Sequence, residues 1–433
     1  MRAEAVTILL FLAGLAACLL LGLNILLALL FGLFCLVGYC LRRGHRPGEV
    51  LRMLAEGMLQ VKGILIIFVL IGCLTALWRL SGVIPTIICL SLRVVDPTIL
   101  VACSFLLCSM MSFLTGTSFG TASTMGVLCM MIATSAGVDP MLAGGAVISG
   151  IFVGDRCSPM SSSAQLVCTL THTSIYGNIR NMLRSGAVPF LLTLLLYVLL
   201  GRSEGSAVDS GITAVMESGS ILSPLCVLPA ALILVLALFR VNVKLSMLVS
   251  ILVSMVLAVA VQGVSVTEVL LTMVRGYRAA DPALAALMDG GGLRSMVSVG
   301  GIVLLSSSYA GVFSHTPLLD GVRGKLAALA SRAGGYAAVL VTSVFTAAVC
   351  CNQTLGTMLT VQLCEGLIEG KERFALAIED TIILIAALIP WSIAGAVPVA
   401  AIGAPQTCLL CAFYLFAQPL WGLITSFIRR RGT

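Results

Sequence analysis

Charged residues are scarce in this sequence. Only 10% of its 433 residues are Asp, Glu, Lys or Arg, whereas 59% are hydrophobic. Soluble domains carry about 25% charged residues, so this composition excludes a water-soluble globule. The apolar residues form continuous runs rather than alternating with polar ones, which excludes a β-barrel. The sequence therefore predicts an all-α, polytopic membrane protein, surrounded by membrane lipid, with about 10–12 apolar segments.

Residues that support metal or nucleophilic chemistry are also few. The chain has three histidines, and its 16 cysteines are scattered singly or paired as neighbours, without metal-ligand spacing. It contains no Ser-His-Asp or H-E-x-x-H pattern, and its GTSFGT stretch lacks the lysine of a phosphate loop. These absences argue against an enzyme and against direct use of ATP. We expect no cofactor, only a sodium ion or a proton as the coupling ion.

The net charge of +7 does not indicate nucleic acid. The basic residues lie between apolar runs, for example at 42–52 and 429–431, which is the positive-inside pattern of cytoplasmic loops. The first apolar stretch, from Val6, is too long for a signal peptide and is read as the first spans. We expect a multi-pass protein of the inner (cytoplasmic) membrane with both termini in the cytoplasm.

The chain is predicted to be one transporter domain, 1–433, made of two similar halves. A polar loop at 202–220 separates a first repeat, about 60–201, from a second, about 296–428. Each half holds a hydroxyl-rich interruption, GTSFGTASTMG at 116–126 and CNQTLGTMLT at 351–360. Each then has an acidic residue and a proline in a later apolar run. Paired interruptions of this kind indicate a transporter binding site, although small residues also serve close helix packing.

The stretch GDRCSPMSSS at 154–163 is the strongest signal in the first half. A carboxylate such as Asp155 is costly inside a bilayer, by roughly 2.5–3.5 kcal/mol on insertion scales. Pro159 breaks a helix and frees backbone carbonyls. Those carbonyls and the nearby hydroxyls are hard oxygen ligands that suit a small alkali cation, and the hydroxyls belong to Ser158, Ser161, Ser162 and Ser163. The alternative is an interfacial loop in which Asp155 and Arg156 are solvated.

The second half repeats the combination of acid and proline. Glu379, Asp380 and Thr381 begin an otherwise apolar run that Pro390 interrupts, with Trp391 beside it. Two adjacent acids ahead of a broken helix favour a functional site. The alternative is capping of a helix N-terminus at a membrane surface.

Taken in order, these motifs resemble the NhaC-type sodium/proton antiporters. GTSFGT, GDRCSPMSS, N-Q-T-L and E-D-T with L-I-P-W-S-I-A-G-A carry the similarity, which runs from about residue 60 to 425. The resemblance implies inverted repeats, re-entrant hairpins at 100–136 and 336–368, and broken helices at 141–170 and 376–402. It also implies an elevator-like motion and a homodimer.

The sequence departs from this family at two places. Members usually carry an aspartate soon after the S-P-x-S run, where this chain has serines near Ser162, and often have G-D-Q where it has Cys351, Asn352 and Gln353. Relatives also move organic anions or amino acids.

Our first hypothesis is a secondary active transporter that exchanges sodium for protons, with Asp155 and Asp380 carrying the cation. The alternative is symport or exchange of a small organic anion or amino acid, with Arg156 pairing with the substrate carboxylate. A channel or a membrane enzyme lacks supporting motifs. The candidate ion- or substrate-binding residues are Thr117, Ser118, Thr121, Asp155, Ser158, Ser161, Ser162, Asn352, Gln353, Thr354, Glu379, Asp380 and Thr381.

Overall fold

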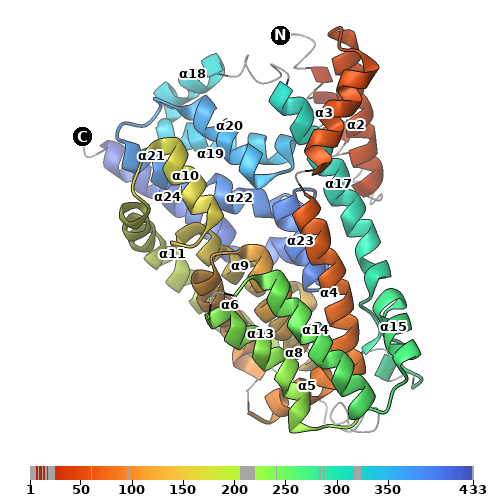
Figure 1. The fold of residues 1–433 in the computed structure, drawn as a ribbon. Coiled ribbons are helices and arrows are strands. Elements are labelled where there is room, and N and C mark those ends of the chain that lie inside the picture. The colour runs from red at the N-terminus through yellow and green to blue at the C-terminus, as the bar shows by residue number, and fades with distance from the viewer. Residues whose placement is uncertain are drawn as a thin grey trace.

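The protein folds as helices, which confirms the all-α prediction (Figure 1). The computed structural model describes residues 25–59, 61–94, 97–204, 220–239, 241–281, 284–285, 288–315 and 323–431, with scattered positions between 6 and 17. Within these ranges the β-type pairing consists of one isolated antiparallel bridge between Tyr277 and Gly290. Much of the apolar stretch that begins at Val6, up to residue 24, and most of the polar loop at 202–220 lie outside the described residues.

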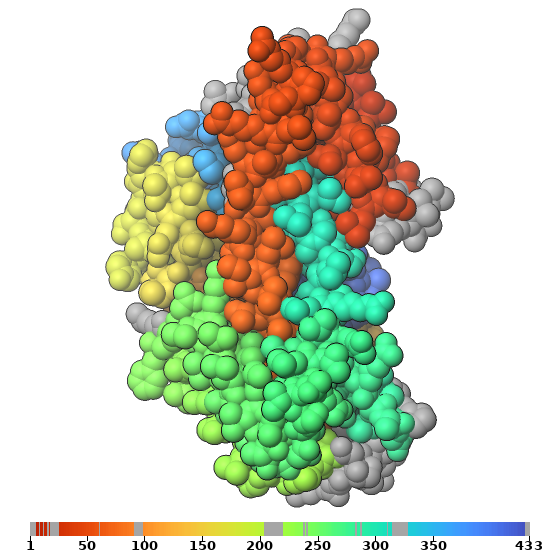
Figure 2. Space-filling model, turned by 45° about the vertical axis from the view of Figure 1, so that its right-hand side comes forward, coloured from red at the N-terminus to blue at the C-terminus, as the bar shows by residue number. Residues whose placement is uncertain are grey.

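Seven helical segments in the described ranges are long and apolar enough to cross a membrane, or eight if one bent pair counts as a span. The seven are α4 (Lys62–Leu80), α6 (Pro97–Thr115), Ser118–Ser135, α11 (Ile175–Glu204), α14 (Val243–Ala260), α17 (Leu293–His315) and Gln406–Ile428. The bent pair joins Lys371–Leu388 to α23 (Ile393–Ala401). Other helices are α2 (Ile25–Arg42), α3 (Pro47–Leu59), α5 (Val83–Val94), α13 (Leu228–Leu238), α15 (Val266–Arg275) and α18 (Arg323–Ala333). Figure 2 shows α4, in orange, directly beside α17, in teal.

In the first half, a helical hairpin is followed by a broken helix. After α6 the chain turns at 116–117 and continues through α7 (Ser118–Thr121), the π-helical turn η1 (Ala122–Gly126) and α8 (Val127–Ser135). The broken helix consists of α9 (Pro140–Cys157) and α10 (Ser162–Thr171). Asp139 caps α9 by accepting a hydrogen bond from the Met141 N–H, and Pro140 fits its first turn.

The second half has the same order of elements. The hairpin consists of α19 (Gly335–Cys350), a turn at 351–352 and α20 (Gln353–Cys364). The broken helix consists of α21 (Lys371–Asp380), α22 (Ile382–Leu388) and α23, and the chain bends by 58° between α22 and α23. Figure 1 places α9, α22 and α23 in the middle of the molecule, with α4, α14, α15 and α17 along one side.

The two hairpin turns have nearly the same backbone conformation. Gly116 and Cys351 both adopt positive φ angles, 67° and 56°. The next residues, Thr117 (φ −143°, ψ 123°) and Asn352 (φ −140°, ψ 126°), each cap the helix that follows with the side chain. These matching turns place Ser118 and Gln353 at equivalent positions, as the first residues of their helices.

The two helix breaks also match. Each runs from a helix end in extended conformation, at Ser158 or Ile389, through a proline to a serine that caps the next helix, Ser161 or Ser392. When the two breaks are aligned in sequence, the acidic residues of the two halves do not coincide. The residue equivalent to Asp155 in the second half is an alanine in α22, Ala386, and not Asp380.

Small residues let α6 and α9 approach closely. A Cβ added to Gly154 would lie 2.0 Å from the carbonyl carbon of Ser112, and one added to Gly150 would lie 2.7 Å from the Phe105 carbonyl oxygen. The Ser112 hydroxyl donates to the Ile151 carbonyl across the same contact. This tight packing fixes the end of α9, where Asp155 lies.

We therefore expect Gly154→Ala to lower the thermal midpoint of the detergent-solubilised protein. Its methyl group must push two packed helices apart, and such overpacking costs about 1–3 kcal/mol. Gly38→Ala is the matched control, because nothing lies within 4 Å of a Cβ at Gly38. Midpoints measured by size-exclusion chromatography after heating test the difference. Equal midpoints for the two variants would contradict the close approach.

Candidate functional site

Asp155 lies in the last turn of α9 and is buried, with 4% of its surface exposed. Four neutral groups donate hydrogen bonds to its carboxylate. Oδ1 accepts from the hydroxyls of Ser161 (3.4 Å) and Ser163 (3.3 Å). Oδ2 accepts from the Ser118 hydroxyl (3.4 Å) and the Gln353 amide (3.1 Å). Among the described residues no cationic side chain forms an ion pair with it, so its negative charge is solvated by dipoles alone.

The donors to Asp155 come from both halves of the chain. Ser118 and Gln353 are the equivalent first residues after the two hairpin turns, and both donate to Oδ2. Ser161 and Ser163 lie in the break and the first turn of α10. Gln353 also donates to the Ile383 carbonyl of α22 at 2.9 Å. The two hairpins and the first broken helix therefore converge on one carboxylate.

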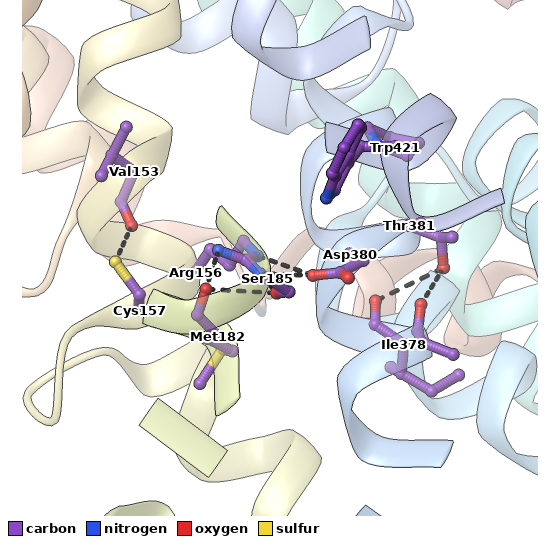
Figure 3. A network of polar contacts seen from close by, with 12 residues as sticks. Val153, Arg156, Cys157, Met182, Ser185, Ile378, Asp380, Thr381 and Trp421 are labelled. Atoms are coloured by element: carbon purple, nitrogen blue, oxygen red, sulfur yellow. Dashed lines mark hydrogen bonds and ion pairs between the residues drawn. The ribbon is translucent and has the colours of Figure 1, made fainter. Parts of the chain in front are cut away.

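The adjacent Arg156 forms a buried ion pair with Asp380 of α21 (Figure 3). Its Nε–H and one terminal N–H donate to Asp380 Oδ1, at 2.9 and 2.5 Å. The remaining donors bond Ser185 Oγ (2.7 Å) and the Met182 carbonyl (3.1 Å) on α11, and Tyr414 Oη (3.3 Å) on α24 (Phe413–Arg431). All five guanidinium N–H groups thus have an acceptor within the protein.

This pairing corrects two expectations. Arg156 has no N–H left for a substrate carboxylate, and Asp380 is neutralised by Arg156 rather than free for a cation. The sequence singled out both residues because charges are rare in apolar runs. Buried charges in proteins are usually paired, and here each is the other's partner.

Glu379 is the third carboxyl of the region, in the last turn of α21. It is 0% exposed, and neither of its oxygens has a hydrogen-bond partner in the described part of the protein. Asp155, Arg156 and Asp380 are the charged groups near enough to interact with it electrostatically. The three acids near the end of α9 therefore have three different environments. Asp155 accepts hydrogen bonds from neutral groups, Asp380 pairs with Arg156, and Glu379 has no hydrogen-bond partner among the described residues.

The other predicted residues support the backbone around the site or lie outside it. Thr117 and Asn352 cap helices, and the Ser158 hydroxyl donates to the Phe113 carbonyl at 2.6 Å. Thr121 bonds the Thr117 carbonyl at 2.9 Å, and Thr381 donates to the Ala377 carbonyl at 2.7 Å. Ser162 and Thr354 are exposed.

Sequence reasoning missed the partners of Arg156. Met182 and Ser185 lie in the polar start of α11, beside Arg180 and Arg184, and Tyr414 lies in α24. No motif in either segment indicates a contact with Arg156. Only the packing of these helices on α9 brings them to the guanidinium.

A cavity of about 290 Å³ adjoins the first hairpin turn and the first helix break. Thr115 and Gly120 line it from the hairpin, Met160 from the break, and Asn242 and Lys244 from the start of α14. Met160 lies between Ser158 and Ser161, so the cavity reaches the segment that follows Asp155.

The buried pair leads to a prediction about stability. We expect Arg156→Met to lower the free energy of unfolding by about 3–5 kcal/mol, because it leaves Asp380 as an uncompensated buried charge. The double variant Arg156→Met/Asp380→Asn removes both charges and should regain part of the loss. Thermal midpoints of the wild type, both single variants and the double variant give the coupling. Additive losses would contradict the ion pair.

Comparison with known proteins agrees with this geometry. The family model described as "Na+/H+ antiporter family" matches residues 3–164 and 150–428. These two matches together span nearly the whole chain.

Curated relatives are similar over most of their length. The "Na(+)/H(+) antiporter NhaC" of Alkalihalophilus pseudofirmus is 27% identical over 417 residues, 93% of this chain and 88% of the relative. The protein of the same name from Bacillus subtilis is 26% identical over 381 residues, 84% of each chain. The "Malate-2H(+)/Na(+)-lactate antiporter" of Bacillus subtilis is 25% identical over 306 residues, 69% of this chain and 65% of the relative. The family match, the helical membrane fold and the buried carboxylate between two hairpin turns agree: this chain belongs to the Na+/H+ antiporter family.

Proposed function

We propose that this protein is a secondary active transporter that exchanges sodium ions for protons across the cytoplasmic membrane. One observation carries the proposal: the Asp155 carboxylate is buried, has no cationic partner among the described residues, and is surrounded by neutral oxygen- and amide-bearing side chains from both halves. A sodium ion supplies the positive charge that this carboxylate lacks.

The sodium ligands would come from the groups that now donate to Asp155. The hydroxyls of Ser118, Ser161 and Ser163 donate hydrogen bonds to the carboxylate, and each also has lone pairs to offer a cation. The amide of Gln353 can contribute its oxygen in the same way. Such hard, neutral ligands with one carboxylate suit a small alkali cation, as in other transporters with unwound helices.

The two departures from the family pattern fit a site with a single carboxylate. The resemblance places its additional acids near Ser162 and at Asn352. In this chain Ser163 makes a neutral contact with Asp155, and the Asn352 side chain caps α20. One carboxylate neutralises one sodium ion. Asp380 is not part of this set, because Arg156 compensates its charge.

We also propose that the two halves are inverted repeats. The equal turns at 116–117 and 351–352 and the equal breaks at 158–161 and 389–392 support this relation. A site that receives ligands from both halves can be opened to either side of the membrane by small movements between them. The arginine-rich segments at 42–52 and 429–431 support a cytoplasmic location of both termini.

Transport of a small organic anion is the alternative. The hydrogen bonds of Arg156 within the protein argue against it. An anion needs a free cationic partner, and all the N–H groups of Arg156 bond within the protein. In proteoliposomes with either an inward or an outward sodium gradient, which would drive symport or exchange respectively, we expect no uptake of labelled malate, lactate or arginine above that of empty liposomes. Sodium-dependent uptake of any of the three would favour the alternative.

Asp155→Asn tests the proposed site directly. In proteoliposomes that contain a pH-sensitive dye, a sodium pulse should drive proton flux with the wild type. With Asp155→Asn the flux should fall to the level of empty liposomes, because the only charge that attracts sodium at this position is gone. Glu268→Gln removes an exposed carboxylate from α15 and serves as the control. Wild-type flux with Asp155→Asn would remove Asp155 from the mechanism.

The neighbouring serines provide a matched pair of variants. Ser163 contacts Asp155 whereas Ser162 is exposed, although the two are adjacent in sequence. We expect Ser163→Ala to raise the half-saturating sodium concentration about fivefold, the equivalent of one hydrogen bond of about 1 kcal/mol. Ser162→Ala should leave it unchanged. The concentration dependence of proton flux measures both, and equal effects of the two variants would contradict the proposed ligand set.

A further inference from the structure

Glu379 is a fully buried acid that nothing in the sodium site uses. Its two oxygens have no hydrogen-bond partner among the described residues, whereas Asp155 accepts four hydrogen bonds and Asp380 accepts two from Arg156. Arg156, the nearby cation, has no N–H left to offer.

An ionised carboxylate in this position is strongly disfavoured. Removing a charge from water without a partner costs several kcal/mol, and in practice the group takes up a proton instead. In the arrangement described here, Glu379 therefore holds a proton. Asp155 differs in this respect, because four hydrogen-bond donors reach its carboxylate, and such donors favour the anion.

The groups around Glu379 determine how its proton affects the site. The charges of Asp155, Arg156 and Asp380 reach it, and the thiols of Cys157 and Cys168 are near enough to interact with it electrostatically. The Arg156 and Asp380 charges cancel. With Glu379 protonated, the four acidic and basic groups carry one net negative charge, and with Glu379 ionised they carry two.

From this arrangement, and resting on the proposed sodium/proton exchange, we propose that Glu379 carries the exchanged proton at a position separate from the sodium ligand Asp155. When Glu379 releases its proton, the added negative charge draws a sodium ion to Asp155. When Glu379 takes up a proton, that attraction is lost and sodium leaves. One proton departs as one sodium ion enters, so the summed charge of the four groups and the bound sodium does not change. Because binding linkage is reciprocal, each ion lowers the affinity for the other by the same factor.

The test measures proton release and sodium binding on the same purified full-length protein. Sodium is added to protein in weakly buffered detergent solution, protons are followed with a pH dye, and bound ²²Na is counted. For the wild type we expect about one proton released per sodium bound, and sodium affinity that rises roughly tenfold per pH unit. Glu379→Gln has the shape and charge of the protonated acid. It should bind sodium weakly, release no protons and show less than a twofold change in affinity per pH unit.

Controls separate a proton carrier from a structural residue. Glu268→Gln makes the same chemical change on the surface of α15 and should behave as the wild type. Glu379→Asp restores a carboxyl and should restore proton release. If Glu379→Gln does not purify as a folded protein, Glu379→Asp replaces it, and we then expect its curve of sodium affinity against pH to be displaced.

Several outcomes would overturn the proposal. Wild-type proton release from Glu379→Gln would place the proton on Asp155 itself, and an undisplaced curve for Glu379→Asp would have the same meaning. Complete loss of sodium binding at saturating sodium would make Glu379 a sodium ligand. A wild type that neither binds sodium nor releases protons would instead contradict the proposed function, so the two failures are distinguishable.

Discussion

The buried ion pair between Arg156 and Asp380 determines how the two halves of this protein meet. Arg156 belongs to α9 of the first half and Asp380 to α21 of the second, and α11 and α24 supply the other acceptors of the guanidinium. Neither charge is stable alone in an apolar interior. The four helices must therefore pack together for both charges to be buried at once.

Fixing this pair also orients the two acids beside it. Successive residues on a helix point about 100° apart, so a side chain next to a fixed one has little choice of direction. Next to Arg156, Asp155 faces the two hairpin turns and their neutral donors. Next to Asp380, Glu379 points into a region without hydrogen-bond partners among the described residues. The ion pair is thus flanked by two carboxyl groups in different surroundings. Asp155 accepts hydrogen bonds from four neutral donors, whereas Glu379 has no hydrogen-bond partner among the described residues.

The similarity of the halves is structural more than chemical. Their turns and breaks share backbone angles, yet Asp155 is matched by Ala386, and Ser118 by Gln353. The matching turns bring Ser118 and Gln353 to the same carboxylate, while that carboxylate, Asp155, belongs to the first half only. This difference between the halves gives a single carboxylate in the proposed sodium site.

Composition and pattern alone were sufficient for the membrane class, the all-α fold and the interrupted segments, and they drew attention to Asp155 as a carboxylate in an apolar run. These properties follow from local physics, because a bilayer excludes free backbone groups and prolines and glycines break helices wherever they occur. The partners of each charge could not be read in the same way. Arg156 and Asp380 pair in the structure although they are 224 residues apart in the sequence. Glu379 is the sequence neighbour of Asp380 and is not part of this pair. Which acid pairs with arginine, which receives hydroxyl groups and which is left without a partner depends on how α9, α21 and the hairpin turns pack, and only the tertiary structure decides it.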